Sequence, residues 1–444
     1  MTRRRVWCEH AVLTHGVESG VLISIDEGVV VHIEVDRPRD EAEPLRGLTM
    51  PGFANAHSHA FHRALRGRTH GGGGDFWTWR EEMYAVASRL DPANYLRLAT
   101  ATFGEMVLAG YTCVGEFHYV HGSDDVDPNA MGRAMIEAAS AAGIRLTLLD
   151  ACYLRAGAKQ PLTPPQQRFS DGTARAWCDR VSLLEDAPGA RIGAAIHSVR
   201  AVDADSIATV AKYASDRGFP LHAHVSEQPA ENEQALAEFG CSPTVVLAQQ
   251  GALSPSFTAV HATHIDEADI DLYAKSRSTC CFCPTTERDL ADGIGPSAEL
   301  RAAGVDLCIG SDQHAVIDPF EEMRAVELDE RLRSRRRGTH QPRSLLKAAT
   351  VNGYRSLGWH GGGEIAVGAI ADLTTVALDS VRLAGSANDP ERLVDAVVFA
   401  ATSADVTHVI VDGRTVVNGG QHVLVDVAQE LAAAIAEVTG VIAE

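Results

Sequence analysis

The sequence contains no apolar run long enough to cross a lipid bilayer, and its first residues, MTRRRVWCEHAVLTHG, lack the apolar core of a secretory signal peptide. Positive charge is also scarce, because 39 Lys and Arg stand against 59 Asp and Glu and the formal net charge is −20. That excess repels nucleic acid and anionic membranes at long range. We therefore expect a cytoplasmic protein without nucleic-acid or membrane partners, in which any anionic ligand needs a local cationic pocket.

A paired cysteine framework is missing as well. The nine cysteines are an odd number scattered over 444 residues, which is typical of buried thiols in a reducing compartment. The segment CCFC, 280–283, has a CxxC spacing, but no second CxxC completes a four-sulfur metal site. We interpret this segment as a buried strand, with a redox or metal pair as the alternative.

The glycine-rich segment THGGGGDFWTWRE, 69–81, lacks the GK[ST] ending of a phosphate loop, which argues against nucleotide binding. We expect the loop at 69–76 to be a mobile segment that brings Trp77, Trp79 and Arg80 over a pocket. A plain solvent-exposed loop is the alternative.

The composition itself, 45% hydrophobic and 22% charged, is ordinary for a soluble enzyme. Most of the chain alternates short apolar runs with longer helical patterns, as parallel strands joined by crossover helices do. The apolar runs lie at 48–59, 111–119, 144–154, 190–198, 219–227, 257–264, 278–286 and 305–312. Eight such units predict an α/β fold, a closed (β/α)8 TIM-like barrel with its chemistry at the C-terminal ends of the strands.

The two ends of the chain do not fit a barrel. Residues 1–50 carry β patterns such as VLISIDEGVVVHIEV, and residues 364–444 carry ADLTTVAL and VTHVIVDGRTVVNG between Gly and Asp turns. We expect these two segments to form a small β-sandwich beside a barrel domain at 51–363. The final AQELAAAIAEVTG predicts a terminal helix.

Histidines and carboxylates recur at the ends of the apolar runs. They are His57, His59, Glu116, His118, His197, His224, Glu227, His261, His264 and Asp312. Alternate side chains of a strand share a face, so His57 and His59 can bind one ion together; a hydrogen-bonded pair is the alternative. A barrel brings this pair close to His224 of the fifth strand and Asp312 of the eighth. Three imidazoles and a carboxylate suit Zn²⁺ or Fe²⁺, with one position left for water.

Two further side chains belong beside this set. Glu227 follows His224 by three residues, so it could take a proton from an activated water and pass it to a leaving group without being a ligand. His261 ends the sixth strand, where it could hydrogen-bond a developing tetrahedral centre. Each residue alone would more often be structural, and it is the combination that predicts a hydrolytic site.

The segments PGFANAHSHAF, HSVR, HVSE, VHATH, CPTTE and GSD, in this order, resemble the amidohydrolase superfamily and its mononuclear metal-dependent deaminases. The fourth strand ends in His197 and offers no lysine for the carbamylated bridge of dinuclear members, which favours one metal. The segments FWTWREEMY, EFHYVHG, HSVRAV, CPTTERDLADGI and RLRSRRRG resemble the N-formimidoyl-L-glutamate deiminase family of histidine degradation, over residues 48–340.

This resemblance implies metal ligands at His57, His59, His224 and Asp312, with Glu227 as proton shuttle, His261 as polarising partner and Asp312 as a second proton acceptor. It also implies that Arg80, Tyr119, His197 and Arg200 hold the glutamate portion of an acidic substrate. Arginine suits carboxylates because its guanidinium donates in pairs. Position 62 is often glutamine in the family and is His62 here. We expect His62 to face the substrate, with packing of the first helix as the alternative.

The combined hypothesis is a metal-dependent hydrolase that deiminates N-formimino-L-glutamate to N-formyl-L-glutamate and ammonia, with one divalent metal, zinc before iron. The superfamily resemblance also implies a homodimer. One alternative is a deaminase of a purine or pyrimidine ring, which would not need Arg80 and Arg200. Another is a barrel that has lost catalysis and serves as a metal-binding scaffold.

Overall fold

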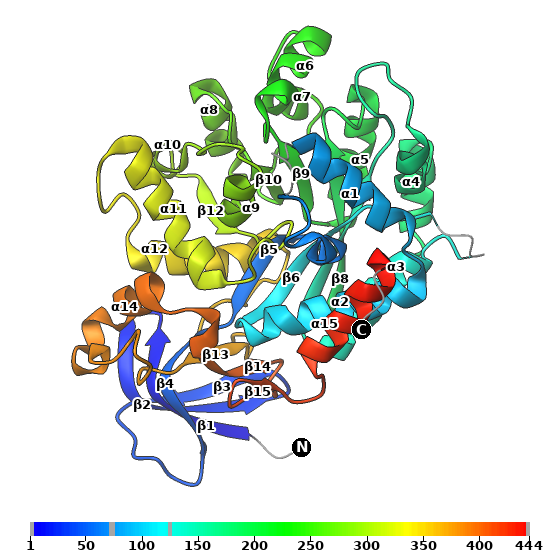
Figure 1. Ribbon diagram of the computed structural model, residues 1–444. Coiled ribbons are helices and arrows are strands. Elements are labelled where there is room, and N and C mark those ends of the chain that lie inside the picture. The colour runs from blue at the N-terminus through cyan, green and yellow to red at the C-terminus, as the bar shows by residue number, and fades with distance from the viewer. Residues whose placement is uncertain (1–3, 71–75, 123–126, 441–444) are drawn as a thin grey trace.

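The computed structural model describes residues 4–70, 76–122 and 127–440. Its main body is a barrel of parallel strands surrounded by helices, and a second sheet lies at the lower left in Figure 1. The barrel strands are β5 (Phe53–Ser58), β6 (Tyr111–His118), β7 (Arg145–Cys152), β8 (Ala190–Ser198), β9 (Leu221–Val225), β10 (Phe257–His261), β11 (Thr279–Phe282) and β12 (Asp306–Ile309). They pair in chain order, and each predicted apolar run contains one of them. The (β/α)8 barrel is therefore confirmed.

The barrel closes at the C-terminal ends of its first and last strands. A parallel bridge joins Ser58 to Asp312, just past the end of β12. The backbone N–H of Ser311 donates to the carbonyl oxygen of His57 across the same seam, at 3.1 Å. Because the chemistry of such barrels sits at these strand ends, the seam lies beside the predicted site.

The helices cover the outside of the barrel, and side-chain caps begin several of them. Asp91 accepts from the backbone N–H of Asn94 at the start of α2, and Asp203 accepts from that of Ser206 at the start of α5, which satisfies donors left open in a first turn. The helices are α1 (Phe76–Ser88), α2 (Pro92–Leu108), α3 (Ala130–Ala142), α4 (Ala174–Val181), α5 (Ala204–Arg217), α6 (Pro229–Phe239), α7 (Pro243–Gln249), α8 (Glu267–Ser276), α9 (Pro284–Asp289), α10 (Ser297–Ala302), α11 (Pro319–Ser334), α12 (Pro342–Lys347), α13 (Gly353–Ser356), α14 (Leu393–Ala400) and α15 (Val427–Thr439). No helix in the described ranges is long and apolar enough to cross a membrane.

The apolar run at 48–59 proves to hold two strands rather than one. Its first part belongs to β4 (Glu43–Pro51), which lies in the second sheet, and β5 begins at Phe53. The chain passes between the sheets at Gly52, where an added Cβ would lie 2.1 Å from the hydroxyl oxygen of Thr112. Only glycine fits this close approach. The run at 278–286 is simpler, because Cys280, Cys281 and Phe282 lie in the buried β11 as predicted, and Cys283 follows the strand; all three thiols are buried and free.

The second sheet is built from both ends of the chain. Its order is β16-β15-β14-β13-β4-β1-β2-β3, so β4 brings the N-terminal strands against the C-terminal ones. The strands are β1 (Arg4–Leu13), β2 (Gly16–Asp26), β3 (Val29–Glu34), β13 (Leu373–Val376), β14 (Val406–Val411), β15 (Arg414–Asn418) and β16 (Gln421–His422), besides β4. An apolar core that includes Ile23 of β2 and Ile410 of β14 forms between its two arms. The β unit predicted from the two terminal segments is thus present as one eight-stranded sheet.

Two contacts tie the outlying parts to the barrel. Arg145 of β7 donates to both carboxylate oxygens of Asp372, at 2.7 and 3.3 Å, where β13 begins. The predicted terminal helix is α15, which packs Val427 and Leu431 against Ala101 of α2. Division of the chain at 50/51 and 363/364 into domains stays a prediction.

Candidate active site

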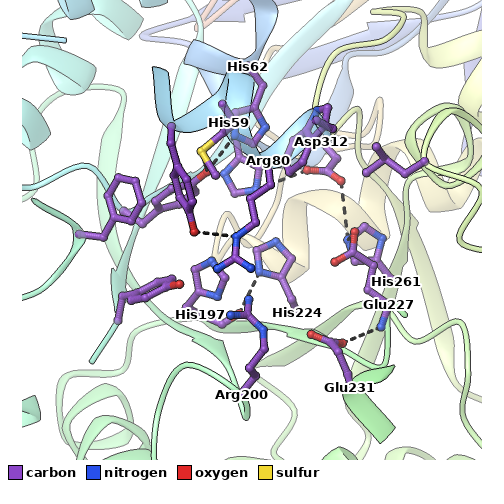
Figure 2. A pocket seen from close by; sticks show the side chains of 17 residues that line it. His59, His62, Arg80, His197, Arg200, His224, Glu227, Glu231, His261 and Asp312 are labelled. Atoms are coloured by element: carbon purple, nitrogen blue, oxygen red, sulfur yellow. Dashed lines mark hydrogen bonds and ion pairs between the residues drawn. The ribbon is translucent and has the colours of Figure 1, made fainter. Parts of the chain in front are cut away.

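A cavity opens at the C-terminal end of the barrel, and Figure 2 shows side chains from many strands pointing into it. It is lined by His59, His62, Arg80, Tyr119, His197, Arg200, His224, Glu227, His261 and Asp312. These are the site residues predicted from the sequence except His57, which is fully buried. Residues from the first to the last barrel strand therefore meet at one place, as the strand-end pattern predicted.

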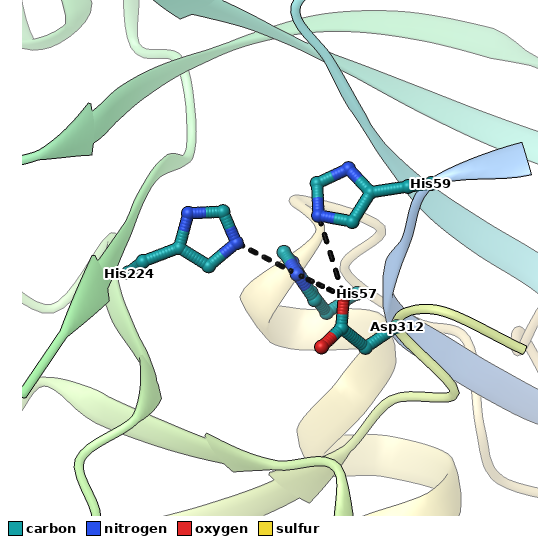
Figure 3. Close-up of side chains that lie close together, drawn as sticks. All are labelled: His57, His59, His224 and Asp312. Carbon is teal, nitrogen blue, oxygen red and sulfur yellow. Dashed lines mark hydrogen bonds and ion pairs between the residues drawn. The ribbon is translucent and has the colours of Figure 1, made fainter. Parts of the chain in front are cut away.

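Four of these side chains form a cluster that can hold one metal ion (Figure 3). One atom each from His57, His59, His224 and Asp312 lies within 4.8 Å of all the others. The Nε2 atoms of His57 and His224 are 3.1 Å apart. Oδ1 of Asp312 lies 3.4 Å from Nε2 of both His57 and His59. The parallel barrel supplies this convergence, because His57 and His59 lie at the end of β5, His224 lies in β9 and Asp312 lies in the loop after β12.

Hydrogen bonds turn the ring nitrogens of two ligands toward the cluster. Nδ1 of His59 lies 2.8 Å from the carbonyl oxygen of Phe117, and Nδ1 of His224 lies 2.9 Å from that of His197. A carbonyl can only accept, so each Nδ1 carries the proton and each Nε2 offers a lone pair.

The charge states of the cluster also suit a divalent cation. Burial lowers the pKa of His59 and of His224 well below the usual range, which keeps these rings neutral. Burial alone would raise the pKa of Asp312, but the neighbouring His57 holds it well below its usual value. Neutral imidazoles beside an ionised carboxylate are the donors that metal binding requires. The residues present therefore fit the predicted mononuclear site.

The loops after the strands adopt unusual backbone conformations around this cluster. Left-handed φ angles occur at the non-glycine residues Ser226 (52°), His261 (69°), Ala262 (50°), Asp312 (44°) and His314 (60°). Such residues cost roughly 1–3 kcal/mol each and persist where the surrounding structure holds them. Their gathering at one end of β9, β10 and β12 marks this end as the functional one.

Glu227 and His261 stand beside the cluster, as Figure 2 shows. Nε2 of His261 lies 3.6 Å from Oδ2 of Asp312 and 3.8 Å from Oε1 of Glu227. Burial raises the pKa of Glu227 to about 7, against the opposing effect of His261. A carboxyl group with a pKa near neutrality can both take up and release a proton at physiological pH. This arrangement suits general acid–base chemistry on a small molecule in the cavity.

Two carboxylates that support this pair were missed by the sequence argument. Oε1 of Glu287 lies 3.3 Å from Nδ1 of His261 and also accepts the backbone N–H of Cys283 at 2.9 Å. Glu231 of α6 accepts the backbone N–H of Glu227 at 2.9 Å. Glu287 lies in the segment CPTTE, one of the segments that carry the family resemblance, so the sequence did offer a signal for it. Glu231 had no sequence signal beyond its position four residues after Glu227.

The other side of the cavity carries aromatic and cationic groups. Nε2 of His62 lies 2.8 Å from the hydroxyl of Tyr119, and Arg80 donates from Nε to the hydroxyl of Tyr84 at 2.6 Å. Arg200 donates to the carbonyl oxygen of Ala156 at 3.2 Å. His62 lines the cavity and is 2% exposed, so it both faces the pocket and packs within it. The two arginines provide the local positive charge that an acidic chain requires for an anionic ligand.

The glycine-rich loop is described at both of its flanks, and at the N-terminal one Nε2 of His70 lies 2.6 Å from Oδ1 of Asp289. Residues 71–75 and the side chain of Trp77 lie outside the described residues, and with them most of the loop that we expect to be mobile. Helix α1 begins at Phe76 and brings Trp79 and Arg80 to the cavity, so these two side chains are delivered by a helix.

Three strand-end residues lie elsewhere among the described residues. His118 belongs to a separate buried group with His121 and Asp150, in which Arg180 already donates to both oxygens of Asp150, at 2.7 and 2.9 Å. Nε2 of His264 lies 2.7 Å from the backbone oxygen of Asp292. Glu116 is fully buried, and its Oε2 accepts from the hydroxyl of Ser58 at 2.7 Å.

Comparison with known proteins places this site in a family. The profile of the amidohydrolase family matches residues 48–416. Formimidoylglutamate deiminase of Pseudomonas aeruginosa is 38% identical over 436 residues, which cover 94% of this chain and 95% of that protein. Among solved structures, an amidohydrolase from Brucella melitensis is 30% identical with a TM-score of 0.90, covering 98% of this chain and all of that one.

A more distant structure shares the fold. It is described as an adenosine deaminase from Xanthomonas campestris with bound zinc, and it is 22% identical with a TM-score of 0.83 over 98% of both chains. The extent of the family match, the barrel and the cluster of three histidines and an aspartate at its mouth agree with one another. The chain belongs to the amidohydrolase family.

Proposed function

We propose that this protein is a metal-dependent hydrolase that converts N-formimino-L-glutamate and water to N-formyl-L-glutamate and ammonia. The observation that carries the proposal is the presence of Arg80 and Arg200 in the same cavity as Glu227 and three of the four metal ligands. Two arginines match a substrate with two carboxylates, and a ring substrate would have no use for them. The relative from Pseudomonas aeruginosa, which carries the name of this activity, supports the same assignment.

The chain's own residues divide the work between binding and proton transfer. Arg80 and Arg200 hold the carboxylates, with Tyr119, His197 and His62 along the cavity between them and the ligands. The substrate's formimino carbon is thereby directed toward Glu227 and His261. A divalent cation, when bound, supplies a water that is acidic enough to react near neutral pH.

The proton balance can be assigned to named groups. The water oxygen adds to the formimino carbon and loses both protons, one to Glu227 and one to Asp312. His261 donates a hydrogen bond to the tetrahedral centre. The bond to the terminal nitrogen then breaks, and that nitrogen gains the two protons and leaves as ammonia. Glu227, with its pKa near 7, is the group that passes a proton in both directions.

We also propose that the metal is zinc, with Fe²⁺ as the second choice. Three histidine nitrogens and one carboxylate suit both ions, so ligand type does not separate them. A zinc ion is described in the Xanthomonas campestris structure of the same fold.

We further propose that the protein is a cytoplasmic homodimer that takes part in histidine degradation. Sedimentation of the purified protein tests its oligomeric state.

The first test is ammonia release by purified, metal-loaded protein. N-formimino-L-glutamate should yield ammonia and N-formyl-L-glutamate, and a chelator should abolish the release. Guanine, cytosine and adenosine serve as parallel substrates. Ammonia from a ring substrate alone would replace the proposed function with the ring deaminase alternative, and a protein that retains no metal would point to a scaffold.

The matched variant is Glu227→Gln, which keeps the shape of the side chain and removes its proton transfer. We expect this variant to retain metal and to lose activity by roughly 10²–10⁴-fold, the usual contribution of general acid–base catalysis. Full activity with full metal content would remove Glu227 from the mechanism.

A further inference from the structure

A buried chain of hydrogen bonds runs behind the metal ligands, on the opposite side from the cavity. Nδ2 of Asn55 donates to Oγ of Ser311 at 2.6 Å, and that Oγ lies 2.9 Å from Nδ1 of His314. Nε2 of His314 lies 3.2 Å from Oγ of Ser58, which donates to Oε2 of Glu116 at 2.7 Å. All five residues are fully buried, and none of them lines the cavity.

The donors and acceptors of this chain can be satisfied in one direction. The hydroxyl of Ser311 accepts from the Asn55 amide, so it donates to Nδ1 of His314. Nε2 of His314 then carries the ring proton and donates to the hydroxyl of Ser58, which donates to Glu116. The second oxygen of Glu116 accepts the backbone N–H of Ala60 at 2.7 Å. Each link fixes the orientation of the next.

The chain crosses the seam at which the barrel closes. Ser58 is the last residue of β5 and lies between His57 and His59, so its side chain points to the face opposite the two ligands. Ser311 and His314 flank Asp312 in the loop after β12. At this seam a single bridge, between Ser58 and Asp312, takes the place of an extended strand ladder.

The conformation of the loop adds to the need for such support. Asp312 and His314 both have left-handed φ angles, 44° and 60°, which are unfavourable for side chains other than glycine. The hydrogen bonds of His314 to Ser311 and Ser58 hold the loop in this form. The two metal ligands at the end of β5 and the one in the loop are therefore tied together by residues that do not line the cavity.

We propose that Ser58, Glu116 and His314 are positioning residues of the metal centre, which act by clamping the first strand to the loop that carries Asp312. They act through the ligands, since none of the three lines the cavity. The proposal concerns metal binding alone and does not depend on which substrate the protein uses.

The test is the dissociation constant for zinc, measured in the absence of substrate by competition with a chromophoric chelator on metal-depleted and refilled protein. Ser58→Ala deletes one hydroxyl and breaks the chain between His314 and Glu116. We expect zinc to bind about 10- to 100-fold more weakly, as is usual when partners of metal ligands are lost. Chelator-induced loss of zinc should also become faster.

The matched control is Thr112→Val, which deletes another buried hydroxyl of the same barrel. Thr112 bonds to the carbonyl oxygen of Phe53 at 3.1 Å and to the hydroxyl of Tyr354 at 2.6 Å, away from the chain that includes Ser58. We expect this variant to lower the melting temperature without changing zinc affinity. If Ser58→Ala and Thr112→Val alter zinc affinity equally, or neither alters it, the clamp is refuted.

Glu116→Gln provides a second route to the same question if Ser58→Ala does not fold. The amide NH₂ of glutamine replaces an acceptor with a donor opposite Ser58 or Ala60, so the chain loses its direction with little change in volume. Zinc affinity should again fall about 10- to 100-fold. An unchanged affinity in a folded Glu116→Gln protein would overturn the proposal, whatever the outcome of the ammonia assay.

Discussion

At the residue scale, Glu227 shows how burial and neighbouring charges set a useful pKa. Burial raises the pKa of this carboxyl to about 7, His261 opposes the rise, and the negative charge of Glu231 adds to it. Glu227 must be ionised to take a proton from water, so activity should be lost as the pH falls below about 7. The same group would be inert as a general acid if its pKa stayed near 4.

Replacement of Glu231 by glutamine tests this account. Glu231→Gln removes a negative charge but keeps an oxygen that can accept the N–H of Glu227. The pKa of Glu227 should fall, so the acidic limb of kcat/KM should move to lower pH. A pH profile with the limb unmoved, or moved to higher pH, would contradict the electrostatic role of Glu231.

A second residue-scale prediction concerns Arg200. Arg200→Met keeps an apolar stem of similar length and removes the guanidinium that binds a carboxylate. Loss of a charged hydrogen-bond partner costs roughly 1.5–3 kcal/mol, or about 10- to 150-fold in kcat/KM. Steady-state kinetics should show this loss for N-formimino-L-glutamate. Equal kcat/KM in the two proteins would show that Arg200 does not contact the substrate.

At the element scale, α9 begins directly after β11 and supports the end of β10. Glu287 lies in its first turn, where it accepts the N–H of Cys283 and reaches Nδ1 of His261. Glu287 thus connects the start of α9, at Cys283, to His261 at the end of β10. Helix α1 has a comparable role on the other wall, because it carries Arg80 to the cavity.

We expect Glu287→Gln to lower kcat more than it changes KM. The glutamine oxygen can still accept from Cys283, but the charge that orients His261 is lost, and in the proposed mechanism His261 acts mainly in the transition state. Metal content should remain at the wild-type level, which serves as the control. A change confined to KM would assign Glu287 to substrate binding instead.

At the scale of the whole molecule, buried ion pairs link the barrel to its helices and to the second sheet. Asp150 of β7 is fully buried and accepts from Arg180 and from Nε1 of Trp177 at 2.9 Å. Burial opposes its ionisation, but Arg180 outweighs burial and holds the pKa of Asp150 well below its usual value. The folded pKa is lower than the unfolded pKa of about 3.9, so the pair stabilises the protein above that pH.

This linkage predicts how stability depends on pH. The contribution of Asp150 is complete near neutral pH and is lost as the pH falls below about 4. Asp150→Asn should destabilise the protein by roughly 3–5 kcal/mol at pH 7, because Arg180 loses a buried partner. The difference in the free energy of unfolding between the wild type and the variant, measured with denaturant, should be smaller at pH 3 than at pH 7. A larger difference at pH 3 would contradict the stabilising role of ionised Asp150.

The alternation of apolar runs and helical patterns was enough to predict the barrel, because strand periodicity and crossover helices are local properties of the chain. The strand-end positions of His57, His224 and Asp312 were enough to predict their meeting, because parallel strands of a barrel all end on one side. The two strands within 48–59 were not separable in this way, since the apolar pattern continues through Pro51 and Gly52.

Glu231, Glu287 and the chain from Asn55 to Glu116 became visible only in the folded protein. Their roles depend on contacts between segments as much as 256 residues apart, such as Ser58 with His314. They also depend on left-handed φ angles at non-glycine residues, which the residue types do not predict. A linear pattern states which face of a strand a side chain occupies. It does not state which distant group that face meets, because the meeting depends on barrel closure and loop conformation, which are properties of the whole packed molecule.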